Sequence, residues 1–249
     1  MRKFGIIGYP LSHSFSKKYF QNKFIKENIK DAEFDIFPIE NIKNIKEVIN
    51  NNPDLYGFSV TIPHKKTIIP YLNELDKTAL NIGAVNCVKV IRESKNYILK
   101  GYNTDCIGFE ESLKPLLKPQ HTSALVLGTG GASQAVAYVL KKLNIKFQFV
   151  SRNKTENTIT YNDVDANCIL KNLLIINTTP LGMYPNINKH PNIPYEHITD
   201  AHYMYDLIYN PSETEFLKFG RLNNARTKNG EEMLHLQAEA AWKIWNNLF

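Results

Sequence analysis

The sequence predicts an α/β protein, and three observations support this prediction. Short apolar runs alternate with amphipathic segments from the N-terminus onward, as in a layered α/β architecture. A glycine-rich turn at 128–131 joins an apolar run to a helical pattern. The 249 residues are 43% apolar and 22% charged, which excludes a disordered or low-complexity chain and allows one large domain or two of ordinary size.

The first half of the chain alternates apolar runs of strand length with segments of helical spacing. Pro70 interrupts the third helical segment, and a polar turn at 92–95 separates the last two strands. We expect strands at 4–8, 33–39, 55–60, 84–91 and 96–100, and helices at 14–28, at 42–50 and from Pro63 to about 81.

The second half begins after a connection at 113–122, which contains two prolines. Apolar residues from Glu231 to the end recur at helical spacing and predict a C-terminal helix. The stretch 185–200 is rich in Pro, Asn and His and predicts a loop. We expect strands at 124–127, 145–150, 173–177 and 203–207, and a helix at 132–143.

The charge and the cysteines favour a cytoplasmic protein whose partner is a small molecule. Thirty basic and 24 acidic residues give a net charge of +6, but the basic residues are scattered and form no nucleic-acid-binding arm. The first apolar run stops at Tyr9-Pro10, and no stretch is long enough to span a membrane. Three separated cysteines predict reduced thiols and no zinc site. We therefore expect no nucleic acid, no membrane and no metal.

The glycine-rich turn is a candidate phosphate site. Gly128, Gly130 and Gly131 lie where a strand turns into a helix, so the backbone can approach a pyrophosphate and the helix N-terminus can bind it. Ser133 stands where Gly or Ala is usual, and an ordinary tight turn is the alternative interpretation. The surrounding strand–helix–strand unit of about 30 residues favours dinucleotide binding.

The residues after the next strand favour NADP over NAD. NAD-binding proteins usually place Asp or Glu here, where the carboxylate bonds the ribose hydroxyls. This chain has Ser151-Arg152-Asn153-Lys154 instead. Arg152 and Lys154 can pair with a 2′-phosphate, and a solvated cation at a strand end is the alternative interpretation of the arginine.

Polar clusters in the first half follow predicted strands and are candidates for binding or catalysis. Each has a plainer explanation, because serines cap helices, lysines keep surfaces soluble, and Asn and Asp favour turns. Pro63 would let a helix begin after it, which would place Lys65 near a helix N-terminus. The clusters lie at 12–16, 59–65, 83–86 and 101–105.

Nine motifs follow one another along the chain: GYPLSHSFS at 8–16, VTIPHK at 60–65, GAVN at 83–86, NTD at 103–105, GTGGA at 128–132, SRN at 151–153, NTTPLGM at 177–183, DLIYNP at 206–211 and GxxMxxxQA at 230–238. A single motif of this kind carries little weight, whereas the whole series is typical of one family. The chain resembles the shikimate dehydrogenases from end to end.

The resemblance implies an enzyme that reduces 3-dehydroshikimate to shikimate with NADPH, in the pathway to chorismate and aromatic amino acids. It implies an α/β substrate-binding domain at 1–104, completed by a C-terminal helix at 234–249. A Rossmann-type, doubly wound NADP-binding domain would occupy 105–233, with the active site in the cleft between the domains. Such an enzyme would be a monomer or a homodimer and would need no metal.

The resemblance also implies roles for individual residues. Lys65 and Asp105 would be the catalytic pair, with the ammonium stabilising charge on the carbonyl oxygen and supplying the proton, and the carboxylate orienting the lysine. The other implied substrate contacts are Ser14, Ser16, Thr61, Asn86, Tyr209 and Gln237. The implied cofactor contacts are Gly128, Thr129, Gly130, Gly131, Ala132, Ser151, Arg152, Asn153, Thr178, Met183 and Gly230.

Some motif positions depart from the family pattern. Ser59 replaces a common Asn and His64 a common Phe, which affects the expected substrate contacts. Ser151-Arg152-Asn153 replaces Asn-Arg-Thr but keeps the arginine, and Glu231-Glu232 takes the place of a Leu-Gly pair.

Two alternatives to an NADP-dependent shikimate dehydrogenase stay open. A quinate/shikimate dehydrogenase that uses NAD would carry an acidic residue after the second strand of the cofactor domain, and Arg152 argues against it. A non-catalytic sensor of a shikimate-like ligand would lack Lys65 or Asp105, and this chain has both.

Overall fold

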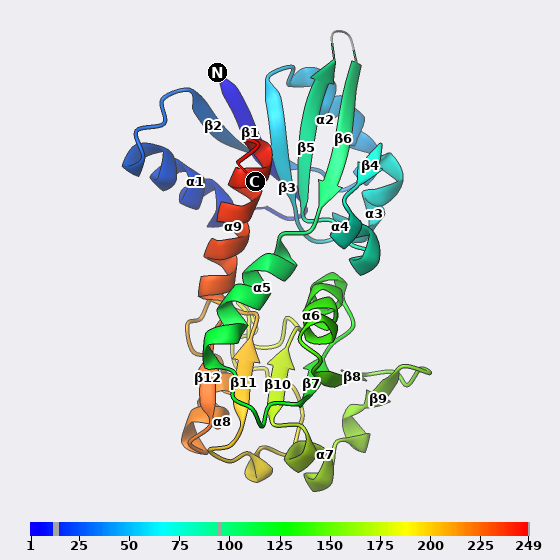
Figure 1. Ribbon diagram of the computed structural model, residues 1–249, viewed down its shortest axis with the longest axis vertical. Coiled ribbons are helices and arrows are strands. Elements are labelled where there is room, and N and C mark those ends of the chain that lie inside the picture. The colour runs from blue at the N-terminus through cyan, green and yellow to red at the C-terminus, as the bar shows by residue number, and fades with distance from the viewer. Residues whose placement is uncertain (12–14, 94–95, 249) are drawn as a thin grey trace. The chain divides into compact units, whose positions relative to one another are not determined.

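The computed structural model describes residues 1–11, 15–93 and 96–248, and it confirms the α/β prediction (Figure 1). The chain forms two compact units. The first comprises Met1–Thr104 and Ala238–Phe249, and the second comprises Asp105–Gln237. Within the described residues, no helix combines the length and the apolar character needed to cross a bilayer.

The first unit is built on a mixed sheet with the strand order β2-β1-β3-β5-β6-β4. β1 pairs in parallel with β2 and β3, while β5 runs antiparallel to β3 and β6, and β4 runs parallel to β6. The carboxyl ends of β1, β2 and β3 therefore lie at one edge. The strands are β1 (Arg2–Gly8), β2 (Ala32–Pro38), β3 (Leu55–Val60), β4 (Glu74–Leu75), β5 (Cys87–Glu93) and β6 (Asn96–Tyr102).

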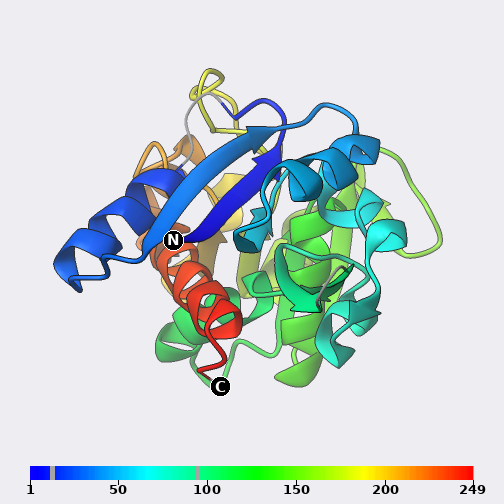
Figure 2. The same ribbon diagram turned by 90° about the horizontal axis from the view of Figure 1, so that it is seen from above.

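Helices cover both faces of this sheet. Side chains alternate along β1, so Phe4 and Ile6 join a core cluster with residues of α1 and α9, whereas Ile7 joins a cluster with residues of α2. Figure 2 shows α1 and α9 on one side of β1 and β2, and α2 on the other. The helical segments are α1 (Phe15–Lys26), η1 (Ile42–Asn44), α2 (Ile45–Asn51), α3 (His64–Thr67), η2 (Ile69–Tyr71), α4 (Lys77–Ile82) and α9 (Glu231–Trp245), whose last residues belong to this unit.

The helical segment predicted after Pro63 is wrong in its middle part, because strand β4 separates α3 and η2 from α4. Pro70 has no N–H with which to continue a helix. Asn73 N then donates to Leu99 O of β6 at 2.9 Å, and Asn73 Oδ1 accepts from Leu99 N at 2.8 Å. These bonds draw the chain into the sheet, and Asp76 starts α4 anew as its N-cap.

The second unit has a sheet with the order β12-β11-β10-β7-β8-β9, in which every neighbouring pair is parallel. The chain starts in the middle at β7, moves outward to β9 and returns to β10 on the other side. This is the doubly wound order, whose switch point between β7 and β10 is a general ligand-binding position. The strands are β7 (Ser123–Leu127), β8 (Lys146–Ser151), β9 (Thr158–Thr160), β10 (Leu174–Asn177), β11 (Tyr203–Asp206) and β12 (Arg226–Lys228).

Several elements of this unit have no counterpart among the sequence predictions, namely β9, β12, α5, α7 and α8. The two strands are three-residue edge strands with polar sequences, and their geometry comes from pairing with β8 and β11. α7 is only six residues long and is defined mainly by its N-cap Asp165. The helical segments are α5 (Asp105–Leu113), η3 (Lys114–Leu116), α6 (Gly131–Lys142), η4 (Tyr161–Asp163), α7 (Ala166–Lys171), η5 (Tyr195–His197) and α8 (Glu215–Leu222).

Candidate active site

The first unit gathers predicted site residues at the edge where β1 and β3 end. Thr61 follows β3, and its amide N donates to β1 at 3.0 Å. Lys65 O accepts from Val85 N, and Asn86 O accepts from Val60 N, each at 2.8 Å. These main-chain bonds bring Thr61, Lys65 and Asn86, from three separate segments, to the same edge of the sheet.

The side chain of Asn86 is held by Thr104, and both residues are buried. Thr104 N donates to Asn86 Oδ1 at 2.6 Å, and Asn86 Nδ2 donates to Thr104 Oγ1 at 3.0 Å. The pair also fixes the main chain immediately before Asp105. The sequence predicted no role for Thr104, although its place in the NTD motif was a signal that could have indicated one.

Lys65 lies in the second position of α3. The helix begins at His64 directly after Pro63, as the sequence predicted, and the Lys65 side chain is half-buried. The main chain of Lys65 is part of α3, and its carbonyl oxygen accepts a hydrogen bond from Val85 N. The side chain that carries the ammonium therefore starts from a fixed point at the strand edge.

Ser16 and Asp105 are buried polar residues at the starts of helices. Ser16 lies in the first turn of α1, and Asp105 is the first residue of α5. Ser14, another predicted substrate contact, lies outside the described residues. Lys65 belongs to the first unit and Asp105 to the second, so their pairing stays a prediction.

Gln237 and Tyr209 are the predicted substrate contacts of the second unit. Gln237 is buried on α9, and its Nε2 donates to Leu234 O at 2.8 Å. Tyr209 follows β11 and is 37% exposed. Partial burial raises the pKa of its phenol, which therefore stays a neutral hydroxyl able to donate a hydrogen bond.

The loops after β7 and β10 meet at the glycine-rich turn. Gly128 has a φ of +103°, and a Cβ there would lie 2.9 Å from Thr178 Oγ1. Thr178 donates to Leu127 O through its amide N at 2.9 Å and through its hydroxyl at 2.6 Å. Two predicted cofactor residues from distant segments, Gly128 and Thr178, thus lie side by side at the switch point of the sheet.

The N-terminus of α6 lies at the end of the glycine-rich turn. Gly130 is its N-cap, and a Cβ there would meet no heavy atom within 4 Å among the described residues. Ser133 stands where the strict motif has Gly or Ala. Its side chain is buried, and its Oγ donates to Gly130 O at 2.7 Å, so the hydroxyl points into the protein. Thr129 is exposed, and Gly131 and Ala132 open the helix, where backbone N–H groups and the helix dipole favour an anion.

Arg152 lies just beyond the end of β8, the strand beside β7. It is exposed, and the turn around it is closed by a 3.4 Å bond from Asn153 N to Ser151 Oγ. Lys154 was the second cation predicted to pair with a 2′-phosphate, but its Nζ lies 3.9 Å from the carboxylate of Asp163. Arg152 is therefore the better placed of the two for an anionic ligand.

Gly230 and Met183 lie on two further loops at the carboxyl edge of the second sheet. A Cβ at Gly230 would come within 2.1 Å of Leu207 O, and Gly230 N donates to Ile208 O at 3.0 Å. No side chain fits there, so the turn after β12 can pack on the chain after β11. Met183, beyond β10, is 44% exposed.

Comparisons with known proteins assign the family. A family model described as the shikimate dehydrogenase substrate binding domain matches residues 6–88. The chain is 37% identical to a shikimate dehydrogenase (NADP(+)) of Methanosphaera stadtmanae, over 97% of this chain and 90% of that protein. The chain belongs to the shikimate dehydrogenase family.

Solved shikimate dehydrogenases have the same fold. The enzyme of Aquifex aeolicus superposes with a TM-score of 0.86 at 35% identity, over 99% of this chain and 93% of that chain. A second shikimate dehydrogenase, solved in complex with NADP+, gives a TM-score of 0.84 at 33% identity, over 99% of this chain and 90% of that chain. These matches confirm a substrate domain followed by a Rossmann-type unit.

His64 is a departure from the shikimate dehydrogenase pattern that the structure explains. The imidazole is buried, and its Nε2 lies 2.7 Å from Ile39 O, so the ring donates there. A phenylalanine could not make this bond. His64 therefore anchors α3, and with it Lys65, to the chain that follows β2. Ser59 lies inside β3, paired with Ile6 and Cys87.

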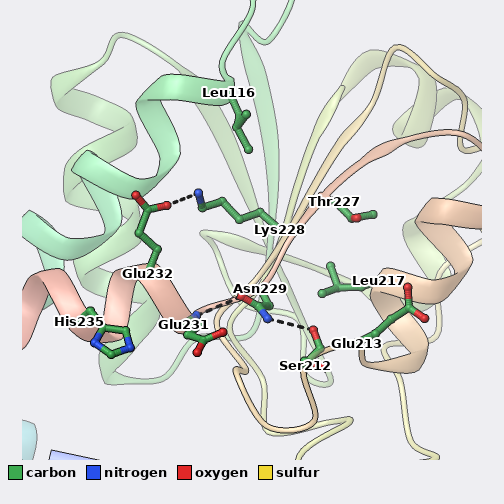
Figure 3. Close-up of a pocket in the computed structure, with 10 residues that line it drawn as sticks. All are labelled: Leu116, Ser212, Glu213, Leu217, Thr227, Lys228, Asn229, Glu231, Glu232 and His235. Atoms are coloured by element: carbon green, nitrogen blue, oxygen red, sulfur yellow. Dashed lines mark hydrogen bonds and ion pairs between the residues drawn. The ribbon is translucent and has the colours of Figure 1, made fainter. Parts of the chain in front are cut away.

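A surface hollow in the second unit is lined in part by Glu231, Glu232 and His235, which lie at the variable positions of the GxxMxxxQA motif (Figure 3). Lys228 pairs with Glu232, and Asn229 Nδ2 donates to Ser212 O at 3.0 Å. No predicted catalytic, substrate or cofactor residue is among those that line it, so we do not place it in the candidate site. The lining residues are Leu116, Ser212, Glu213, Leu217, Thr227, Lys228, Asn229, Glu231, Glu232 and His235.

Proposed function

We propose that this chain catalyses the reversible, NADPH-dependent reduction of 3-dehydroshikimate to shikimate, a step towards chorismate and the aromatic amino acids. One observation carries the proposal. This member of the family has a glycine-rich turn at 128–131, with Arg152 after the next strand, and it also has a polar strand edge at which Lys65 lies. The same activity is named for the relative that is 37% identical to it.

The polar edge of the first unit suits a small polyhydroxy carboxylate. Ser14 and Ser16 would donate hydroxyl hydrogen bonds to the carboxylate without introducing a formal charge. Thr61 and Asn86 would bond the ring hydroxyls, together with Tyr209 and Gln237. Asn86 suits this role because Thr104 already fixes its amide, so little conformational entropy is lost on binding.

Lys65 and Asp105 would act on the carbonyl group. Reduction of the C3 carbonyl carbon builds negative charge on its oxygen, which a nearby ammonium stabilises most strongly in the transition state. Lys65 would then give that oxygen its proton. Asp105 would orient the lysine and accept a hydrogen bond from a neighbouring hydroxyl.

The second unit would hold the cofactor. NADPH, when bound, supplies the hydride for the reduction. Gly128 to Ala132 would bind the pyrophosphate at the α6 N-terminus, and Ser151, Arg152 and Asn153 would bind the 2′-phosphate. Thr178, Met183 and Gly230 would line the rest of the site, on loops that leave the carboxyl edge of the sheet.

Absorbance of NADPH, followed with purified protein and 3-dehydroshikimate, tests the proposal. We expect oxidation of NADPH that depends on the protein and on the substrate. NADH and 3-dehydroquinate in parallel assays test the NAD-dependent quinate/shikimate alternative, which requires turnover with both. A protein that binds shikimate but turns over neither cofactor would be the non-catalytic sensor.

The cellular setting forms part of the same proposal. We place the enzyme in the cytoplasm, because its free cysteines are separated along the chain and reduced thiols are typical of that compartment. The scattered basic charge and an NADPH-linked biosynthetic step agree with this location. The enzyme would act as a monomer or a homodimer, which sedimentation analysis of the purified protein would decide.

A further inference from the structure

Two buried residues of the family motifs have no role in the proposed function. Asp206 ends β11 and Asn177 ends β10, and the strand register places them directly opposite each other. Both have an exposed fraction of 0%. A carboxylate buried to this extent loses its hydration, so its surroundings must compensate it.

Asp206 accepts three hydrogen bonds, one from β10 and two from the chain that follows β11. Its Oδ1 accepts from Asn177 Nδ2 and from Ile208 N, each at 3.0 Å. Its Oδ2 accepts from Thr214 Oγ1 at 2.6 Å. Burial raises the pKa of Asp206 to about 6, and the three hydrogen bonds oppose that rise. With all three partners acting as donors, the arrangement suits the ionised form.

Asn177 extends this network into the loop after β10. Its Oδ1 accepts from Thr179 N at 3.0 Å and from Thr179 Oγ1 at 2.7 Å. Its Nδ2 also donates to Leu181 O at 3.3 Å. The turn between the predicted cofactor residues Thr178 and Met183 is therefore held from inside by one amide side chain.

Thr214 closes the network on the other side. It is the N-cap of α8, and its Oγ1 accepts from Leu217 N at 3.3 Å. Gly182, in the loop after β10, has a φ of +103°, and a Cβ there would lie 3.2 Å from Thr214 Cβ. The loop after β10 thus packs against the same threonine that Asp206 holds.

We infer that Asp206 is a positioning residue, which locks the loop after β10 to the chain after β11 so that both present their ligand contacts together. The inference rests on the proposed function, because the first loop carries Thr178 and Met183 and the second carries Tyr209. Without the carboxylate, three donors lose their acceptor, and the side-chain hydrogen bonds that link the two loops are lost.

Asp206→Ala and Asp206→Asn test this inference through the kinetics with NADPH. We expect Asp206→Ala to raise the KM for NADPH at least about tenfold and to lower kcat, since several buried hydrogen bonds are lost. Asp206→Asn keeps an oxygen for the two donors at Oδ1, so we expect it to recover most of both parameters. Unchanged KM and kcat in Asp206→Ala would overturn the inference.

His202→Ala is the matched control. His202 is 1% exposed and lies just before β11, at the opposite end of the same strand, where its Nδ1 accepts from Thr199 N at 3.0 Å. This variant should lose thermal stability while its KM for NADPH stays within about twofold. A KM increase as large as that of Asp206→Ala would mean that any buried polar loss disturbs the site, and would overturn a specific role of Asp206.

Asn177→Asp gives a second route that does not depend on deleting a side chain. It sets two carboxylates against each other in a buried site, and we expect a large increase in the KM for NADPH. Adding Asp206→Asn places an amide donor opposite the new carboxylate at position 177. The KM of this double variant for NADPH should be at least about threefold lower than that of Asn177→Asp alone. No recovery in the double variant would contradict the pairing.

Direct NADP+ titration, monitored by isothermal titration calorimetry without substrate, separates this inference from the proposed function. A wild-type protein that binds NADP+ but does not reduce 3-dehydroshikimate would refute the proposed activity. The Kd values of the Asp206 variants would still decide the positioning role, with weaker binding supporting it and wild-type binding overturning it.

Discussion

At the scale of single residues, Lys65 gives the most direct test of the mechanism. Its main chain is held by α3 and by the bond from Val85 N, so removal of the side chain should leave the fold intact. We expect Lys65→Ala to lower kcat by roughly 10²–10⁴-fold, the usual contribution of general acid catalysis, with little change in the KM for 3-dehydroshikimate. Steady-state kinetics check this, and an unchanged kcat would remove Lys65 from the mechanism.

Asp105 should behave as a partner of Lys65 in function. Asp105→Asn keeps the shape of the side chain but loses the charge, and we expect a large loss of kcat. Because the two groups would act on one proton, the double variant should lose much less than the sum of the two single effects. The double-mutant cycle measures this, and full additivity would show that they act independently.

Arg152 tests the choice of cofactor. A charge-assisted contact with the 2′-phosphate is worth roughly 1.5–3 kcal/mol, so Arg152→Ala should weaken NADPH binding about tenfold to a hundredfold. Binding of NADH, which lacks this phosphate, should barely change. Lys154→Ala is the control, and we expect a smaller effect because Asp163 already lies near that ammonium. Equal losses for NADPH and NADH would mean that Arg152 supports the loop generally.

At the scale of elements, the C-terminal helix is fastened to the first unit by an ion-pair network. Lys23 of α1 is nearly buried, and its Nζ lies 2.6 Å from Glu27 Oε1 and 2.9 Å from both carboxylate oxygens of Glu239 on α9. Tyr19 also bonds Glu239. The stacked rings of Phe4 and Trp245 supply the apolar part of the same contact.

Glu239→Ala should therefore loosen α9. Because Glu239 is partly exposed and Lys23 keeps Glu27, we expect a loss of about 1–2 kcal/mol in the free energy of unfolding, less than the full cost of breaking a buried pair. Glu27→Ala removes the more exposed partner and should cost less. Urea denaturation of the three proteins provides the comparison, and equal stability would show that the apolar contacts alone hold the helix.

Sequence periodicity predicted the long elements because they carry enough apolar residues to show a pattern. Strands β1, β3 and β7 and helices α1, α6 and α9 lie close to the predicted ranges. The edge strands β9 and β12 escaped prediction, because neighbouring strands impose their conformation. The segment after Pro63 shows the same limit, since contacts with β6, not local propensity, make β4 a strand.

At the scale of the whole molecule, the motif order named the residues of the candidate site, but it did not predict the hydrogen bonds that hold them. That Gly128 and Thr178 share an edge follows from parallel strands ending on the same side. The bonds between Asn86 and Thr104 and between Asn177 and Asp206 depend on strand order and register, which no local pattern contains. These supporting partners became visible only in the structure.

The second unit also contains buried groups whose protonation acts on the stability of the protein in opposite directions. Burial lowers the pKa values of His121 and His202 below 6.5, and in each ring Nδ1 accepts a backbone N–H. The unfolded chain therefore takes up these protons first, and the stability from the neutral rings, present above pH 6.5, is lost as the pH falls. Asp206 has its pKa raised from 3.8 to about 6, so its contribution is complete below pH 3.8 and is lost as the pH rises through about 6.

Acidification from pH 7.5 to 5.5 should therefore separate variants of these groups. The rise in the pKa of Asp206 corresponds to about 3 kcal/mol over its full titration, which partly offsets the loss from the two histidines. Asp206→Asn removes the offset, so its Tm should fall more than that of the wild type over this range. His202→Asn can still accept from Thr199 N but does not titrate, so its Tm should fall less. Thermal unfolding at pH 7.5, 6.5 and 5.5 measures all three, and parallel curves would show that solvent, not burial, controls these groups.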